Sequence, residues 1–123
     1  MKLPIHYLTF ADTTGLDARV FNTLRLGGGW EKRLLGMERV LLTTKYQVIG
    51  RARISMIMSG HKDHILQMYA ASNHLELAMA AEQGVAYDRA GAPARRLQSM
   101  IKNYGPRSVE GTSRATVIFL KPY

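Results

Sequence analysis

The spacing of apolar residues along the chain changes once, near residue 60, from the period of a strand to the period of a helix. In Tyr46–Met58, every second residue is small or apolar, and the residues between them include Arg51 and Arg53. This alternation is typical of a strand with one apolar face and one basic face. From Lys62 to Gln83 the apolar residues recur at helical spacing, with an interruption predicted near Ser72-Asn73. A chain that contains both periods is expected to combine a sheet with helices.

Four further strands and a second helix complete the predicted order. The helix is predicted over Pro93–Tyr104, with Pro93 in its first turn and Gly105-Pro106 ending it. Residues 29–36 are predicted to be a connection or a single helical turn. The order is then several strands, two helices and one closing strand, which predicts an α+β fold: a small curved sheet or barrel with two helices inserted before the last strand. The other strands are predicted at Pro4–Phe10, Val20–Leu26, Met37–Thr43 and 113–123.

Length and composition limit the class of protein. The chain has 123 residues, of which 46% are hydrophobic and 21% charged, which is typical of one globular domain. It contains no cysteine, which excludes disulfides and thiolate metal sites and favours a cytoplasmic location. No apolar run approaches the ~18 residues of a membrane span, and the first residues lack the core of a signal peptide. We therefore expect a cytoplasmic protein without a membrane partner.

The positive charge is concentrated in one third of the chain. The formal net charge is +8, and the stretch Arg19–Arg53 holds eight cations against two anions, Glu31 and Glu38. The other residues hold nine cations against seven anions. This distribution predicts an anionic partner, either a nucleic acid or an acidic protein.

The first candidate site is the strand around Thr23 and Arg25. Residues two apart on a strand share a face, so these side chains can line a cleft and hold a phosphate or a base edge. The alternative is an outward-facing pair, with Arg25 bonded to a neighbouring carbonyl. The three glycines that follow do not form a phosphate loop, because no Gly-Lys-Ser/Thr follows them. Trp30, the only tryptophan, is either a platform on which a base stacks or a plug that closes the barrel.

A second candidate is a stripe of cations that could follow a phosphate backbone. The alternative is an ordinary solvated face. Trp30 and Tyr46 accompany these cations, which favours nucleic acid. The cations of the stripe are Lys32, Arg33, Lys45, Arg51 and Arg53.

The sequence predicts no metal and no other cofactor. His61 and His64 lie three residues apart with Asp63 between them, but no third ligand accompanies them. Asp63 is instead typical of a helix start.

Several motifs together resemble the ASCH domain, the activating-signal-cointegrator homology family of the PUA-like superfold. The first is the strand Thr23-Leu24-Arg25, followed by Gly36 and the hydrophobic strand at Val40-Leu41-Leu42. The run Ile49-Gly50-Arg51-Ala52-Arg53-Ile54 matches the next strand of the family. The stretches "AAEQ", "ARRLQSMIKNYGP" and "ATVIFLKPY" agree with the later half, so the resemblance covers nearly the whole chain as one domain.

The resemblance implies a small barrel with a cleft beside Thr23 that receives RNA or a modified nucleoside. The N4-acetylcytidine amidohydrolases of the family place a lysine and a glutamate where this chain has Val20 and Gly84, so only Thr23 of their triad remains. Neither residue can act as an acid or base, and we predict no catalytic residues of that type. The leading hypothesis is an RNA-binding module, with DNA as a possible ligand. The alternatives are an enzyme acting on RNA or a modified nucleoside, such as a ribonuclease, and a module that binds an acidic protein.

Overall fold

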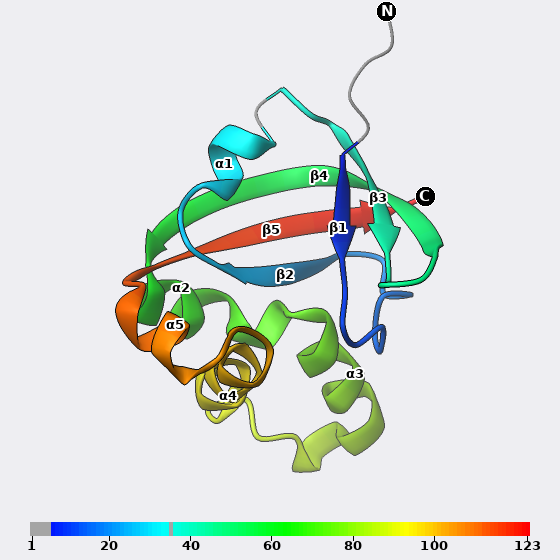
Figure 1. Cartoon of the computed structure of the whole chain (residues 1–123). Helices are drawn as coiled ribbons and strands as arrows, with labels where there is room; N and C mark the ends of the chain where they lie inside the picture. Colours follow the sequence, from blue (N-terminus) through cyan, green and yellow to red (C-terminus); the bar gives the residue numbers. More distant parts are fainter. Residues whose placement is uncertain (1–5, 35) are drawn as a thin grey trace, which may run out of the picture.

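Five strands form one mixed sheet that curls into a half-barrel (Figure 1). This computed structural model describes residues 6–34 and 36–123. The strand order is β1-β3-β4-β5-β2, so the last strand of the chain lies between β4 and β2. β1 pairs parallel with β3, and the other neighbours pair antiparallel. The strands are β1 (Tyr7–Thr9), β2 (Phe21–Leu26), β3 (Arg39–Thr43), β4 (Val48–His61) and β5 (Arg114–Pro122).

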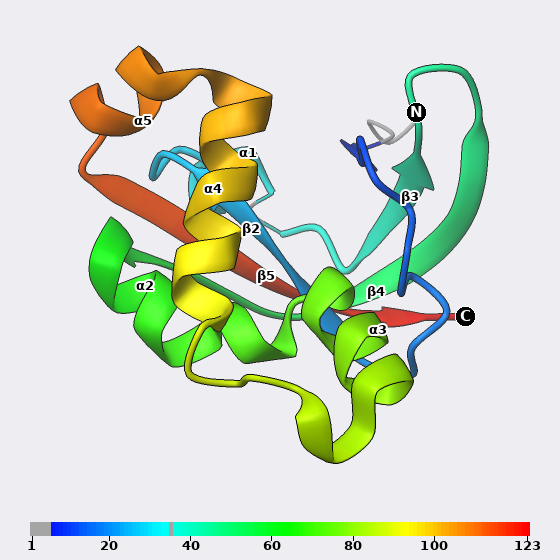
Figure 2. The same ribbon diagram turned by 90° about the horizontal axis from the view of Figure 1, so that it is seen from below.

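Most of the helices follow β4 and precede β5. They gather on one side of the sheet, whereas the short α1 lies apart from them near β4 (Figures 1 and 2). Among the described residues, no helix is long and apolar enough to cross a membrane. The helices are α1 (Trp30–Arg33), α2 (Lys62–Tyr69), α3 (His74–Gln83), α4 (Ala92–Tyr104) and α5 (Pro106–Gly111), with 3-10 turns η1 (Ala70–Ser72) and η2 (Gly84–Ala86).

Two apolar cores lie on opposite faces of β5. Ile118 and Leu120 point into the barrel, where they join a cluster that contains Phe21. Val117, one residue before Ile118, joins the second cluster with Met100 of α4. Because successive side chains of a strand point to opposite faces, β5 is covered on both sides and holds the barrel against the helices.

The α+β class and the barrel-like sheet predicted from the sequence are confirmed. The alternation in β4 is also as predicted, with Ala52 buried and Arg51 and Arg53 exposed. The predicted strand at residues 4–10 is observed as β1, and its first two residues lie outside the described part of the chain.

The helical region differs from the prediction of two helices, because four helices separate β4 from β5. The first predicted helix divides near Ser72-Asn73, as its spacing suggested. Asn73 is extended, and its side chain caps α3 by accepting a hydrogen bond from the Leu75 N–H at 3.0 Å. The predicted stop at Gly105-Pro106 is observed, but a new helix begins there at once. Proline suits the first helical turn, where its missing N–H leaves no hydrogen bond unmade.

Candidate functional site

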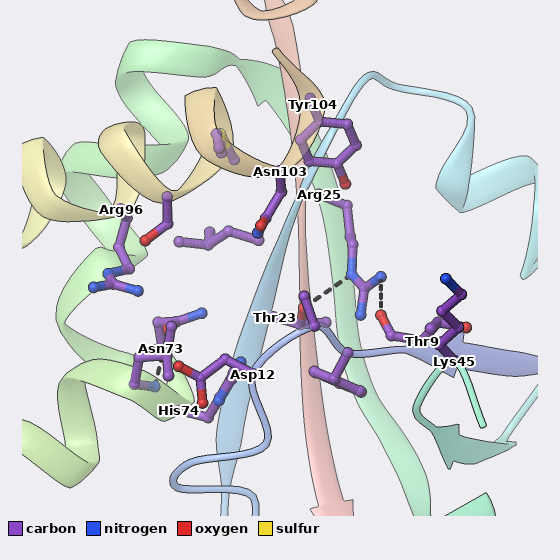
Figure 3. Close-up of a pocket in the computed structure, with 16 residues that line it drawn as sticks. Thr9, Asp12, Thr23, Arg25, Lys45, Asn73, His74, Arg96, Asn103 and Tyr104 are labelled. Atoms are coloured by element: carbon purple, nitrogen blue, oxygen red, sulfur yellow. Dashed lines mark hydrogen bonds between the residues drawn. The ribbon is translucent and has the colours of Figure 1, made fainter. Parts of the chain in front are cut away.

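A pocket of about 330 Å³ lies where β2, the segment after β1 and the helices α3 and α4 meet (Figure 3). These segments are far apart in the sequence and come together only in the fold. Both polar and apolar side chains line the pocket. Its lining residues are Thr9, Phe10, Ala11, Asp12, Thr23, Leu24, Arg25, Lys45, Asn73, His74, Leu75, Arg96, Ser99, Met100, Asn103 and Tyr104.

Thr23 and Arg25 lie side by side in the wall of this pocket, on one face of β2 as their spacing predicts. The Arg25 Nε–H donates to Thr23 Oγ1 at 2.9 Å, and Nη1 donates to the Thr9 carbonyl oxygen at 2.8 Å (Figure 3). The guanidinium carbon lies 4.8 Å from the centre of the Phe10 ring. Burial lowers the pKa of Arg25, although a guanidinium stays charged at any ordinary pH. The two hydrogen bonds use two of its five N–H donors, so the group has capacity for a ligand.

The charge of the pocket lining is positive. Lys45 joins Arg25 and Arg96, whereas Asp12 is the only acidic residue among the lining residues. The backbone N–H of Thr14 donates to Asp12 Oδ1 at 2.9 Å, and this bond together with the Thr14 hydroxyl lowers the pKa of Asp12. Asp12 is therefore ionised at neutral pH, and the lining residues carry three cations against one carboxylate, although Arg96 also contacts the Glu76 carboxylate.

Arg96 reaches the pocket from α4, on the side opposite Arg25 (Figure 3). It is only 8% exposed, and its Nε lies 2.8 Å from Oε2 of the fully buried Glu76. The direction of this contact does not suit a hydrogen bond, so the Arg96 Nε–H has no hydrogen-bond partner among the described residues.

The Glu76 carboxylate is shared with two other groups. Oε1 accepts hydrogen bonds from Arg95 Nη2 at 2.6 Å and from the Tyr87 hydroxyl at 2.7 Å. Sequence reasoning missed this cluster, because a single Glu in a helix and an Arg-Arg pair nineteen and twenty residues later resemble ordinary surface charges. Only the packing of α4 beside α3 makes the carboxylate buried and gives it these partners.

His74 is a second functional candidate that the sequence did not reveal. It is buried, with its ring edge-on to Phe10 and Phe21 at 5.3 and 5.8 Å between centres. Its Nδ1 lies 2.7 Å from the Thr14 carbonyl oxygen, which can only accept, so Nδ1 carries the proton and donates. Burial lowers the pKa of His74 and outweighs the opposing effects of this bond and of Asp12. The ring is therefore neutral at pH 7, and Nε2 is available as an acceptor.

The remaining predicted site residues separate into two groups. Trp30, Lys32 and Arg33 form α1 and do not line the pocket, although Trp30 touches Arg25, whose guanidinium carbon is 5.5 Å from the ring centre. Arg51 and Arg53 lie on β4 around Tyr123 and do not line the pocket either. The eight predicted residues thus do not gather at one cleft.

The Thr23 hydroxyl accepts a hydrogen bond from Arg25, and no base among the described residues is bonded to it. The positions of the expected lysine and glutamate also lie outside the pocket: Val20 is 42% exposed, and Gly84 ends α3 at the end opposite His74. Neither position contributes to the chemistry of this pocket.

Within residues 6–34 and 36–123, no three His, Cys, Asp or Glu side chains are placed to hold a metal ion. His61 instead caps α2, where its Nδ1 accepts a hydrogen bond from the Asp63 N–H at 3.3 Å.

Trp30 is half-buried against the barrel core, and its indole Nε1–H donates to the Leu26 carbonyl oxygen at 3.3 Å. These contacts favour the plug over the stacking platform.

We expect Trp30→Ala to lower the free energy of unfolding by about 2 kcal/mol, less than the 3–5 kcal/mol of a fully buried aromatic. The measurement is a urea titration, with Tyr46→Ala as the control, because Tyr46 is 87% exposed and should change stability by less than about 0.5 kcal/mol. A stable Trp30→Ala protein that binds RNA weakly would instead support stacking.

Comparison with known proteins gives no relative: no family model, no curated protein and no solved structure matches this chain.

Proposed function

We propose that this chain is an RNA-binding module of the ASCH and PUA-like kind, which holds one nucleotide of a single strand in the pocket beside Thr23 and Arg25. The observation that carries the proposal is the half-buried Arg25 guanidinium, which borders a pocket and forms no ion pair with the described residues. A charge that is removed from water without a counterion costs free energy. A phosphate or a base carbonyl at this position would offset that cost and gain charge-assisted hydrogen bonds.

The size and lining of the pocket support a nucleotide. A volume of about 330 Å³ lies at the lower end of the range for small-ligand sites, and such sites combine apolar walls with a few polar groups. The half-exposed Tyr104 offers aromatic surface for a base, while Arg25 and Lys45 offer charge for a phosphate. Asn103 adds amide groups that can bond to base edges.

An enzymatic role has less support. The Thr23 hydroxyl accepts from Arg25, and no base among the described residues is bonded to it. His74 is neutral, and its Nε2 can accept a proton, but no hydroxyl among the described residues donates a hydrogen bond to it. RNA is preferred over DNA only by resemblance to the superfold, and both are to be tested.

Arg25→Ala should weaken the binding of single-stranded RNA by about 1–3 kcal/mol, because it removes a partly desolvated, charge-assisted contact. Arg25→Lys should recover only part of this loss, since an ammonium keeps the charge but lacks the planar fork of donors. The measurement is fluorescence anisotropy with labelled RNA and DNA oligonucleotides at 50 and 200 mM KCl.

Arg89→Ala is the matched control, because Arg89 is exposed and does not line the pocket. It should change the affinity by much less than Arg25→Ala. Absence of binding to RNA and DNA at 50 mM KCl would contradict the proposal and favour the acidic-protein alternative.

A further inference from the structure

Four cations and one aromatic ring form a surface on β3, β4 and β5, which we call the Tyr123 surface. Arg39 of β3 is directly opposite Arg53 of β4, and Arg53 is directly opposite Lys121 of β5. Three cations thus form a row across three neighbouring strands. Arg51 lies two residues from Arg53 on the same face, and its carbonyl accepts a hydrogen bond from the Tyr123 N–H at 3.1 Å. All five residues are exposed.

The row is unfavourable in the free protein. Like charges directly opposite one another on adjacent strands destabilise a sheet. Among residues 6–34 and 36–123, Glu76 forms ion pairs with Arg95 and Arg96, and Asp88 forms one with Arg95. None of these ion pairs involves the row. Ion pairs therefore do not explain the row, whereas a bound polyanion would.

Tyr123 distinguishes the kind of polyanion. Tyr123 as a residue is 50% exposed, and its ring lies among three guanidiniums, with the carbons of Arg51, Arg39 and Arg53 at 5.1, 5.6 and 5.6 Å from the ring centre. Cations interleaved with an aromatic ring are typical of surfaces for single-stranded nucleic acid, where phosphates meet the cations and a base stacks on the ring. An acidic protein would need the cations but not the ring.

The Tyr123 surface is separate from the pocket. None of its five residues lines the pocket. A ligand confined to the pocket therefore does not need this surface.

We infer that the Tyr123 surface is a second contact site for the phosphate backbone of the same single-stranded RNA. This inference rests on the proposed function and extends it from one nucleotide to a longer footprint. Neighbouring β-strands lie about 4.8 Å apart, so the row of cations spans about 10 Å. A single-stranded RNA with stacked bases and a rise of about 3.4 Å per nucleotide presents about three phosphates over that length. Binding must then depend on the length of the RNA.

The test compares 5′-fluorescein-labelled single-stranded RNAs of 4 and 16 nucleotides, by anisotropy at 50 and 200 mM KCl. The variant is Arg39→Gln/Arg53→Gln/Lys121→Gln, and the control, Arg19→Gln/Arg89→Gln/Arg107→Gln, removes three exposed cations elsewhere. We expect the variant to bind the 16-mer at least tenfold more weakly at 50 mM KCl. The plot of log K against log salt should become less steep for the variant, by about 2 in slope, because three phosphate contacts are lost at about 0.7 each. The 4-mer should bind the variant within twofold of the unmodified protein, and the control should keep its affinity for the 16-mer within threefold.

Tyr123→Ala and Tyr123→Phe test the ring separately. The alanine variant should lose affinity for the 16-mer only, and the phenylalanine variant, which keeps the stacking surface, should not. Urea titrations check that each variant remains folded. We expect this result because substitutions of exposed residues change stability little.

The outcomes separate this inference from the proposed function. If the unmodified protein binds both RNAs equally well and the triple variant has no effect, the second site is overturned and the pocket stands. Equal losses in the variant and the control, or equal losses for both RNAs, also overturn it, because general electrostatics then explain the effect. If the unmodified protein binds neither RNA, the proposed function fails and this inference fails with it.

Discussion

Glu76→Gln is expected to lower the free energy of unfolding by about 3–5 kcal/mol at pH 7, because it leaves the buried guanidinium of Arg96 without a counterion. Glu76 has no exposed surface. Among the described residues, its carboxylate is the one that lies within 4.0 Å of the Arg96 guanidinium. The measurement is urea unfolding followed by circular dichroism. Glu82→Gln is the matched control on the same helix, since Glu82 is exposed, and it should change stability by less than about 0.5 kcal/mol. A loss below about 1 kcal/mol for Glu76→Gln would show that Arg96 is already compensated.

The buried Glu76 carboxyl also makes the stability of the protein depend on pH. Burial by itself would raise the pKa of Glu76, but hydrogen bonds from Arg95 and Tyr87 and the nearby guanidinium charges outweigh it and lower the pKa. A carboxyl whose pKa is lower in the folded state binds fewer protons there than in the unfolded state. Its contribution is therefore complete above the unfolded pKa of about 4.3 and is lost as the pH falls through the folded value. Unfolding titrations between pH 7 and 3 should show a steeper loss for the unmodified protein than for Glu76→Gln.

Gly15→Ala is the second substitution with a large expected effect. Gly15 has a φ of +82°, and a β-carbon there would lie 2.0 Å from the carbonyl oxygen of His74 and 3.3 Å from the β-carbon of Ala78. The backbone strain and the overlap each cost about 1–3 kcal/mol. The loop that contains Asp12 would also move away from α3, so the ligand affinity of the pocket should fall together with stability. Both are measurable, by urea titration and by RNA anisotropy.

Gly84→Ala separates the two contributions. Gly84 also has a positive φ, +58°, but a β-carbon there would meet no atom within 4 Å. It should therefore show the backbone cost alone and leave RNA binding unchanged. If Gly15→Ala is no worse than Gly84→Ala, the loop yields easily and does not set the shape of the pocket.

Local patterns in the sequence were sufficient for most of the secondary structure. The alternation that ends in Arg51 and Arg53 predicted a long strand with one exposed basic face, because the strand period depends only on neighbouring residues. Helix α4 was predicted over Pro93–Tyr104 for the same reason, since proline and glycine mark helix ends through their own backbone preferences. The pairing of Thr23 with Arg25 on one strand face is equally local.

The candidate site could be predicted only in part. Thr23, Arg25 and Lys45 were among the predicted residues, but Asn73, His74 and Arg96 were not, because these residues reach the pocket through the packing of α3 and α4. Nothing near Glu76 in the sequence indicates that its carboxylate is buried between two arginines.

The sequence by itself determined the α+β class, the positions of the strands, the excess of positive charge and the shared face of Thr23 and Arg25. These features follow from composition and from contacts between near neighbours. Only the tertiary structure decided where the charges lie. The curl of the sheet places Arg25 and Lys45 at a pocket and leaves Arg51 and Arg53 beside Tyr123. The strand period sets on which face a side chain lies, but strand order and curvature, which arise from long-range pairing, set what that face meets.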